Sequence, residues 1–187
     1  LFYTLKIWTE DPDNSTDCNN NNDTIASREL AVPLCGTYTI GGNAPDFLTV
    51  NEAVNLLNLA GITCPVTFSV RDGIYYEQFI IKDIQGTSPV NKVTFRSESG
   101  DSTMAVIQID PDALKFESMI YLTGSEHITF QELGFITGAT TGSSNNAVLA
   151  EGAKNIAFNG CYFESKKESD FGIVVQGGSQ EIEIRNS

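Results

Sequence analysis

The chain has 187 residues, and its 41% hydrophobic content can bury the core of one domain, or of one domain with a fragment of another. Eleven Lys and Arg stand against 24 Asp and Glu, and the formal charge of -13 repels phosphate backbones, so nucleic acid is not an expected partner. No run of eighteen apolar residues occurs, so no membrane span is expected.

Residues 1–31 predict a β-hairpin that finishes a separate β-sandwich domain. Two strand-like runs flank the loop EDPDNSTDCNNNND, and the first run, LFYTLKIW, already alternates at residue 1. We therefore expect the chain to be an internal or processed piece of a longer polypeptide, with any targeting signal lying elsewhere in it.

The hairpin loop is rich in side chains that carry oxygen. It contains Asp11, Asp13, Asp17 and Asp23, whose carboxylates are ligands of the type that hard cations prefer. The loop lacks the D-x-D-x-D-G spacing with a distal Glu, so a solvated Asx-rich turn is the main expectation and a calcium site the alternative. No other cofactor is expected.

The four cysteines, at positions 18, 35, 64 and 161, match neither a CxxC metal site nor a dense disulfide framework. Cys35 precedes the glycine-rich GTYTIGG and Cys64 precedes PVTF, both at expected element boundaries. A bridge between them would fasten a cap to the body and contribute roughly 3 to 4 kcal/mol; two reduced thiols are the alternative. Cys161 is expected to be a small core residue, and the pairing of Cys18 is left open.

The stretch DFLTVNEAVNLLNLAG predicts one amphipathic helix. Its apolar residues recur at helical spacing from Phe47 to Leu57. Thr49 and Glu52 form a capping box, and Gly61 ends the helix. A single helix ahead of a repeat is expected to cover the apolar mouth of the first unit.

Five short stretches then share one pattern, which recurs at spacings of 27, 35, 28 and 26 residues. In each, the first and third residues are apolar and the second and fourth are small, polar or charged, which is the period of a half-buried strand. A glycine four residues upstream predicts a tight turn before three of them, at Gly124, Gly152 and Gly178. The stretches are VTFSV at Val66, VTFRS at Val93, ITFQE at Ile128, IAFNG at Ile156 and IEIRN at Ile182.

Each unit holds about three short strands, and such periods with almost no helix are typical of a solenoid. We predict an all-β fold, a parallel β-helix over residues 32–187, with further coils expected beyond Ser187. The 35-residue step predicts an outer loop at DPDALKFES, and in-phase glycines disfavour the alternative of an antiparallel sandwich. The aromatic residues expected in one internal column are Phe68, Phe95, Phe130 and Phe158.

The segment from CGTYTIGG to SESGDS resembles the opening of right-handed parallel β-helix modules of the pectin-lyase-like superfamily, in the variety found in large secreted bacterial surface proteins. The resemblance covers roughly residues 34–187, and GTYTIGG is its most distinctive part. It implies an extracellular or cell-surface location, export by a type IX route, and an immunoglobulin-like module that ends within residues 1–31.

The stretches DFLTVNEAV and DGIYYE are also similar to the DFxTIxxAI and GxYxE stretches of pectin methylesterases, which build the fold. That family carries its first catalytic Gln in a QAV motif, and NAV here places Asn146 at that position. Nothing matches its QDTL motif after Phe163, and SDFG at residues 169–172 matches DFIFG weakly. These departures argue against esterase activity.

Other candidate groups are few. The single histidine, His127, is expected in a surface turn. The triplets DTI and DST make Thr24 and Ser102 candidate attachment sites for bacterial O-glycans. Six carboxylates are candidates for a glycosidase acid and base, namely Asp110, Asp112, Glu117, Glu151, Glu164 and Asp170.

Two functions remain open at this point. The first is a noncatalytic β-helix segment of a large secreted cell-surface protein, acting as stalk, adhesin or glycan-contacting module. Its expected partners are other domains of the same chain, extracellular polysaccharide or a cell surface, and the secretion machinery. The alternative is a polysaccharide-active enzyme, an esterase, lyase or glycoside hydrolase, with its active site in later coils, because this fold hosts both kinds of task.

Overall fold

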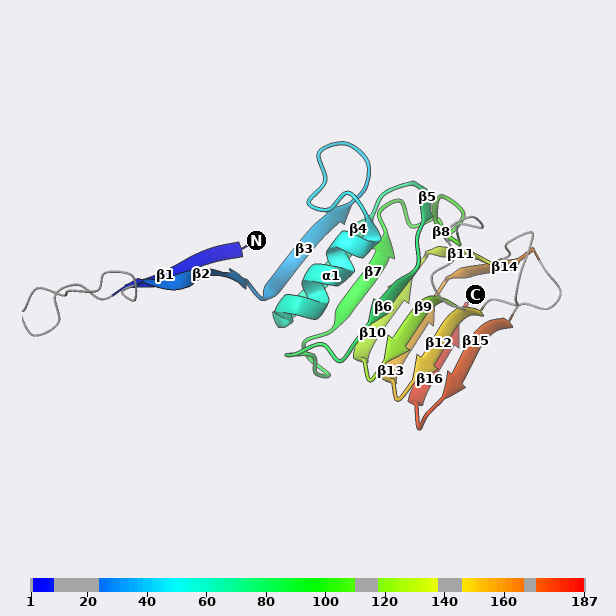
Figure 1. Cartoon of the computed structure of the whole chain (residues 1–187). Helices are drawn as coiled ribbons and strands as arrows, with labels where there is room; N and C mark the ends of the chain where they lie inside the picture. The colour runs from blue at the N-terminus through cyan, green and yellow to red at the C-terminus, as the bar shows by residue number, and fades with distance from the viewer. Residues whose placement is uncertain (1, 9–23, 110–117, 138–145, 167–170, 187) are drawn as a thin grey trace, which may run out of the picture. The chain divides into compact units, whose positions relative to one another are not determined.

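The computed structural model describes residues 2–8, 24–109, 118–137, 146–166 and 171–186, which divide into two compact units, Leu1–Val32 and Pro33–Ser187. In the first unit, β1 (Phe2–Trp8) pairs antiparallel with β2 (Thr24–Ala31), so the expected hairpin is present (Figure 1). The loop that joins them lies outside the described residues. That this hairpin closes an immunoglobulin-like module stays a prediction.

The described residues of the second unit form three parallel sheets and one helix, α1 (Val50–Ala60). Sheet 1 contains β3 (Leu34–Ile40), β4 (Ile62–Val70), β7 (Val93–Ser97), β10 (Glu126–Gln131), β13 (Lys154–Asn159) and β16 (Gln180–Arg185). Sheet 2 contains β5 (Gly73–Tyr76), β8 (Ala105–Gln108), β11 (Gly134–Thr137) and β14 (Tyr162–Ser165). Sheet 3 contains β6 (Phe79–Ile81), β9 (Ser118–Thr123), β12 (Asn146–Glu151) and β15 (Phe171–Gln176).

The chain visits the three sheets in turn and returns to sheet 1 one strand further along, which makes each circuit one coil of a parallel β-helix (Figure 1). All strand pairs that the structure describes in this unit are parallel, so the predicted solenoid is confirmed and the antiparallel sandwich is wrong here. Gly124, Gly152 and Gly178 have φ values of 63°, 64° and 78°, as the tight turns require. The stretch 110–117, where the outer loop was predicted, lies outside the described residues.

The coils are held together by stacked side chains that point inward from sheet 1. Phe68, Phe95, Phe130 and Phe158 occupy equivalent register positions and are at most 1% exposed. Their ring centroids are 4.8, 5.5 and 5.0 Å apart, so the rings form the predicted column. Burial of each ring contributes about 1.5 to 3 kcal/mol, and stacking adds about 0.5 to 1.5 kcal/mol a pair.

Helix α1 lies at the β3 end of the solenoid and contacts both β3 and β6 (Figure 1). The predicted capping box is present in part: Thr49 accepts the Glu52 amide, and the Glu52 carboxylate accepts the amide of Leu48, one residue before the N-cap Thr49. Gly61, with φ 67°, ends the helix as expected. No helix in the described parts of the chain is long and apolar enough to cross a membrane.

A close approach explains Gly41, the first of the two adjacent glycines that end the GTYTIGG stretch. A Cβ at Gly41, where φ is 73°, would collide with the Tyr75 hydroxyl. That hydroxyl lies 3.2 Å from the Ile40 carbonyl oxygen and 2.8 Å from that of Arg71. Arg71 in turn donates to the carbonyls of Gly41 and Asn43, so the turn after β3 is bound to the next coil.

Candidate functional site

The described surface of the second unit is hollowed in at least two places. The first hollow, of about 470 Å³, lies between α1 and β6. The second, of about 360 Å³, lies on the outer face of sheet 1 over β10, β13 and β16. A binding site needs polar groups that are still available to a ligand, so the hydrogen bonds already made by each lining decide between the two.

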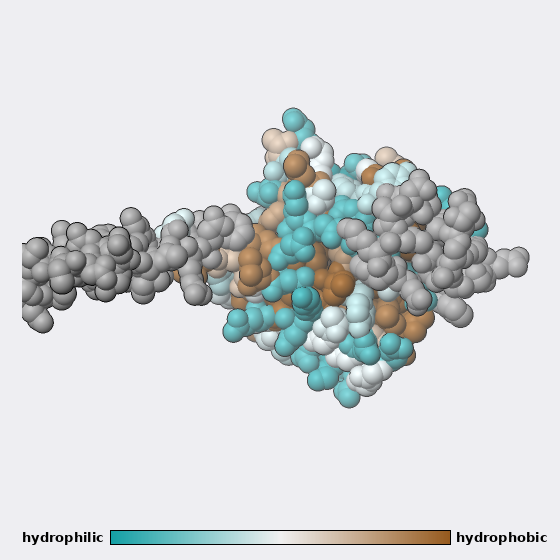
Figure 2. Space-filling view, viewed as in Figure 1, coloured by the Kyte–Doolittle hydropathy of each residue, from teal (hydrophilic) through white to brown (hydrophobic). Residues whose placement is uncertain are grey.

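Asparagines line the first hollow, and most of its amides are engaged in building the fold. Asn58 donates to the Ile80 carbonyl at 2.7 Å and accepts the Lys82 amide at 2.9 Å, so its side chain pairs with β6 as a neighbouring strand would. Asn51 donates to Glu77, and Gln78 donates to the Ser118 carbonyl. Figure 2 shows hydrophilic residues over α1 between hydrophobic patches. The polar groups of this hollow therefore serve mainly to attach α1 to the adjacent coil, and we call this contact the helix seam.

The second hollow lies across three successive coils of sheet 1. Its floor comes from the solvent-facing side of β10, β13 and β16, and the loop before β7 borders it. The described residues that line it are Pro89, Lys92, His127, Thr129, Asn155, Ile156, Ala157, Glu181 and Glu183. Sequence reasoning treated the polar members only as water-facing positions or, for His127, as part of a turn.

One row of this lining has an unusual backbone. His127, Asn155 and Glu181 each precede the first inward residue of their strand and have φ values of 59°, 54° and 54°. In each strand, the residues before and after this position pair with the equivalent residues of the neighbouring strand. The three side chains therefore form a row along the solenoid axis, with one member per coil. His127 is thus part of β10, half-buried at a left-handed position, rather than in the turn that was expected.

The polar side chains of this row are available to a ligand. The side chains of His127, Thr129, Asn155 and Glu181 make no hydrogen bond or ion pair with the described residues. Glu183 is held by Arg185 at 2.5 Å, and Lys154 is held by Glu126 at 3.1 Å beside the hollow. The row therefore presents an imidazole, an amide and a carboxylate that together can donate and accept hydrogen bonds.

A column of hydroxyl groups leads into the hollow from the helix end. Thr37, Thr67, Thr94 and Thr129 occupy equivalent outward positions of β3, β4, β7 and β10. The register continues to Ala157 and Glu183 within the hollow. Threonine suits a half-exposed strand surface, so most of this column is accounted for by strand propensity alone.

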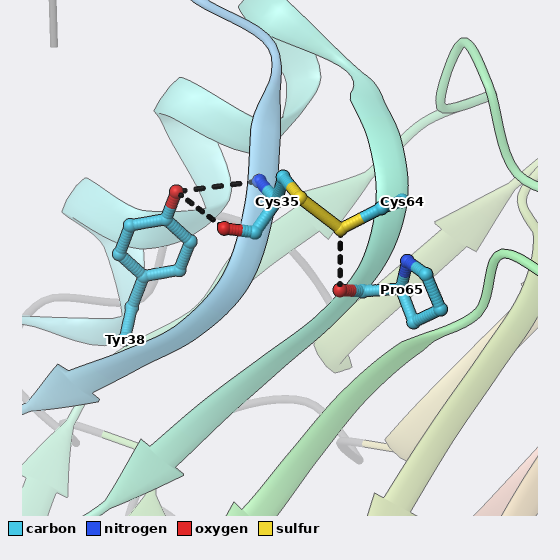
Figure 3. Close-up of a disulfide and its surroundings, with 4 residues drawn as sticks. All are labelled: Cys35, Tyr38, Cys64 and Pro65. Atoms are coloured by element: carbon cyan, nitrogen blue, oxygen red, sulfur yellow. Dashed lines mark hydrogen bonds between the residues drawn. A yellow bond between two sulfur atoms is a disulfide. The ribbon is translucent and has the colours of Figure 1, made fainter.

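The predicted disulfide is present between Cys35 of β3 and Cys64 of β4, with the two Cα atoms 4.9 Å apart (Figure 3). It joins the strands on either side of α1. The Tyr38 hydroxyl accepts the Cys35 amide at 3.3 Å, and Pro65, which has no amide hydrogen, lies where the β3–β4 register shifts.

The predicted calcium ligands and glycan attachment sites stay predictions. The weak calcium candidates Asp11, Asp13, Asp17 and Asp23 lie outside the described residues. Thr24 begins β2, and only its backbone is described; Ser102 is half-buried in the turn before β8. Glycan attachment at either residue stays a prediction.

The candidate catalytic groups that are described are buried or already engaged in a hydrogen bond. Burial raises the pKa of the Cys161 thiol to about 11, so it stays protonated at neutral pH, as a core residue. Glu151 accepts the Tyr121 hydroxyl and Glu164 accepts the Tyr162 hydroxyl, and these bonds raise the pKa of each tyrosine. Asp110, Asp112, Glu117 and Asp170 lie outside the described residues.

No family model matches the chain, and no curated protein matches it. Its fold is similar to crystal structures of the pectin methylesterase from Aspergillus niger, in a deglycosylated and a penultimately deglycosylated form. The chain therefore has a parallel β-helix fold similar to theirs. Each likeness has a TM-score of 0.56 at 16% identity and covers 83% of this chain. The chain spans 57% and 56% of those two chains, and at this identity the likeness shows the fold alone.

Asn146, at the position that the resemblance gives to a catalytic Gln, begins β12 and is half-buried. It pairs in register with Ser118 of β9 and Phe171 of β15. The stretches 138–145 and 167–170 lie outside the described residues. The described part of this region therefore holds an amide at the start of sheet 3 and no carboxylate within the same register row.

Proposed function

We propose that this chain is a noncatalytic, glycan-contacting β-helix segment of a secreted protein. The observation that carries the proposal is the row of His127, Asn155 and Glu181, whose polar groups are unengaged and repeat once per coil over a hollow. A regular line of hydrogen-bond donors and acceptors suits a polymer whose repeating units carry hydroxyl groups.

Secretion is supported by two features. The Cys35–Cys64 disulfide is of the kind that persists in oxidising compartments, and the solved structures with a similar fold are of a pectin methylesterase crystallised in deglycosylated form. The resemblance to modules of large bacterial surface proteins adds other domains of the same chain and a cell surface as proposed partners, with export by a type IX route.

A polysaccharide esterase is the second candidate, because the similar solved structures are pectin methylesterases. Its reaction would need an activated water or carboxylate near the start of sheet 3, where the described residues offer Asn146 and Ser118. The rigid solenoid would serve either function equally, so the fold does not choose between them.

One experiment separates the two. The purified chain is applied to immobilised polysaccharides, and methanol release from methylesterified pectin is measured in the same preparation. We expect retention on at least one polysaccharide with no methanol above the blank. Methanol release that saturates with pectin would establish the esterase instead, and neither retention nor release would overturn both.

A further inference from the structure

We propose that the hollow on the outer face of sheet 1 binds a neutral polysaccharide that lies along the solenoid axis, with about one sugar residue per coil. The inference rests on the proposed glycan contact and goes beyond it, because it names the face, the direction and the charge class of the ligand. This face differs from that of sheet 3, which contains Asn146, the residue at the position that the resemblance to pectin methylesterases gives to a catalytic Gln.

The direction follows from the register. Ile128, Ile156 and Ile182 pair across β10, β13 and β16, so the residues just before them, His127, Asn155 and Glu181, recur at the distance between parallel strands. That distance is about 4.8 Å, close to the length of one pyranose unit in an extended polysaccharide. A chain along this row would therefore meet one protein group with each sugar.

The chemistry of the row suits hydroxyl groups. A hydroxyl donates one hydrogen bond and accepts others, and the row offers the Asn155 amide, which does both, the Glu181 carboxylate, which accepts, and the His127 imidazole. Thr129 adds a hydroxyl on the neighbouring column of β10. None of these side chains has a partner among the described residues, so binding breaks no internal bond.

The charges favour a neutral ligand over a polyanion. Glu181 is an exposed carboxylate in the row, Glu183 is balanced by Arg185, and Lys92 lies on the rim. The whole chain carries a formal charge of -13. The long-range field therefore repels polyuronates, and the described lining contains no arginine that would compensate.

The test uses the purified 187-residue chain on an array of neutral polysaccharides (galactan, galactomannan, xylan and mixed-linkage β-glucan) and acidic ones (polygalacturonate and alginate). We expect retention on a neutral member and none on the acidic ones at low salt. Affinity electrophoresis in the best neutral polysaccharide then compares variants. Retention on acidic polysaccharides alone would overturn the charge class.

Asn155→Gly removes the amide and keeps the left-handed backbone free of strain, because glycine adopts φ near 54° readily. We expect it to weaken binding about 3- to 10-fold, the worth of one hydrogen bond. Asn55→Ala, an exposed asparagine in the hollow beside α1, is the matched control and should bind as the wild type does. Equal melting temperatures would show that both variants are folded.

Glu181→Lys tests the charge argument from the other side, since it should create measurable retention on polygalacturonate that salt abolishes. Glycan binding that Asn155→Gly and Glu181→Lys both leave unchanged would overturn this site while the proposed function stands. Loss of binding in Asn55→Ala alone would move the site to the helix seam. Absence of any glycan binding in the wild type would overturn the site and the proposed function together.

Discussion

The first and the last described coils are built from the same repeat, yet they bury it to different degrees. At the helix end, Val66 and Phe68 of β4 are 1% and 0% exposed. At the other end, Ile184 occupies the same inward column in β16 and is 55% exposed, and Val175 of β15 is 49% exposed. The alternation within a strand thus decides whether a side chain points inward. The neighbouring layer, which is the next coil or the helix, decides how much of that side chain is buried.

The helix end obtains that neighbouring layer from three kinds of contact. The inward apolar residues of α1, namely Val50, Ala53, Val54 and Leu57, are at most 1% exposed. Asn58 supplies hydrogen bonds to the edge of β6, which would otherwise be unpaired on that side. The Glu77 carboxylate accepts the amides of Val50 and Asn51 at the start of the helix, at 2.9 and 2.7 Å. Each contact can be removed singly, which makes the comparison testable.

Phe130→Asp should have the largest effect of the changes considered. Phe130 is 0% exposed between Phe95 and Phe158, with centroid distances of 5.5 and 5.0 Å. A carboxylate there has no partner, and we expect the free energy of unfolding to fall by at least about 4 kcal/mol. Urea unfolding followed by circular dichroism measures it. Unfolding like that of the wild type would contradict the inward column.

Loss of the disulfide should have the next largest effect, confined to the helix end. Replacing Cys35 and Cys64 by Ser releases the loop that contains α1, and we expect a loss of roughly 3 to 4 kcal/mol on the chain-entropy estimate. Hydrogen exchange should show faster exchange in α1 and β3 than in β10 and β13. Uniform acceleration along the solenoid would mean that the bridge does not act locally.

Glu77→Gln weakens the attachment of the helix without altering the core. Gln keeps one acceptor oxygen but loses the charge that favours the start of a helix, so we expect a loss of about 1 kcal/mol. Glu126→Gln is the control, because its ion pair with Lys154 is solvent-exposed and is worth less than about 0.5 kcal/mol. Equal losses in the two variants would show that Glu77 acts as an ordinary surface charge.

The sequence was sufficient for the solenoid because its signal is local and repeated. The alternation of apolar and polar residues alone predicts that Ile128 and Phe130, like Ile156 and Phe158, point inward. The spacing between the repeated stretches then predicts the length of one coil. The helix and its capping box were visible for the same reason, since Thr49 and Glu52 lie three residues apart. The disulfide was the favoured expectation because Cys35 and Cys64 each stand at a predicted element boundary.

The candidate site was missed because its members share no residue type. His127, Asn155 and Glu181 are related only by preceding Ile128, Ile156 and Ile182, so the repeat itself held the signal that could have aligned them. The contacts of Asn58 with β6 and of Glu77 with α1 join residues 22 to 27 apart without any pattern. Such contacts depend on how the coils are stacked, which alternation does not specify.

Ile184→Asp should have the smallest effect, and it tests the comparison of the two ends most directly. The residue shares the inward column with Phe130, but its 55% exposure leaves an aspartate there in contact with water. We expect the 187-residue chain to lose less than about 1 kcal/mol, because the carboxylate keeps its hydration. If the loss instead equals that of Phe130→Asp in the same urea measurement, burial at β16 must come from something other than a further layer, and the difference between the ends would disappear.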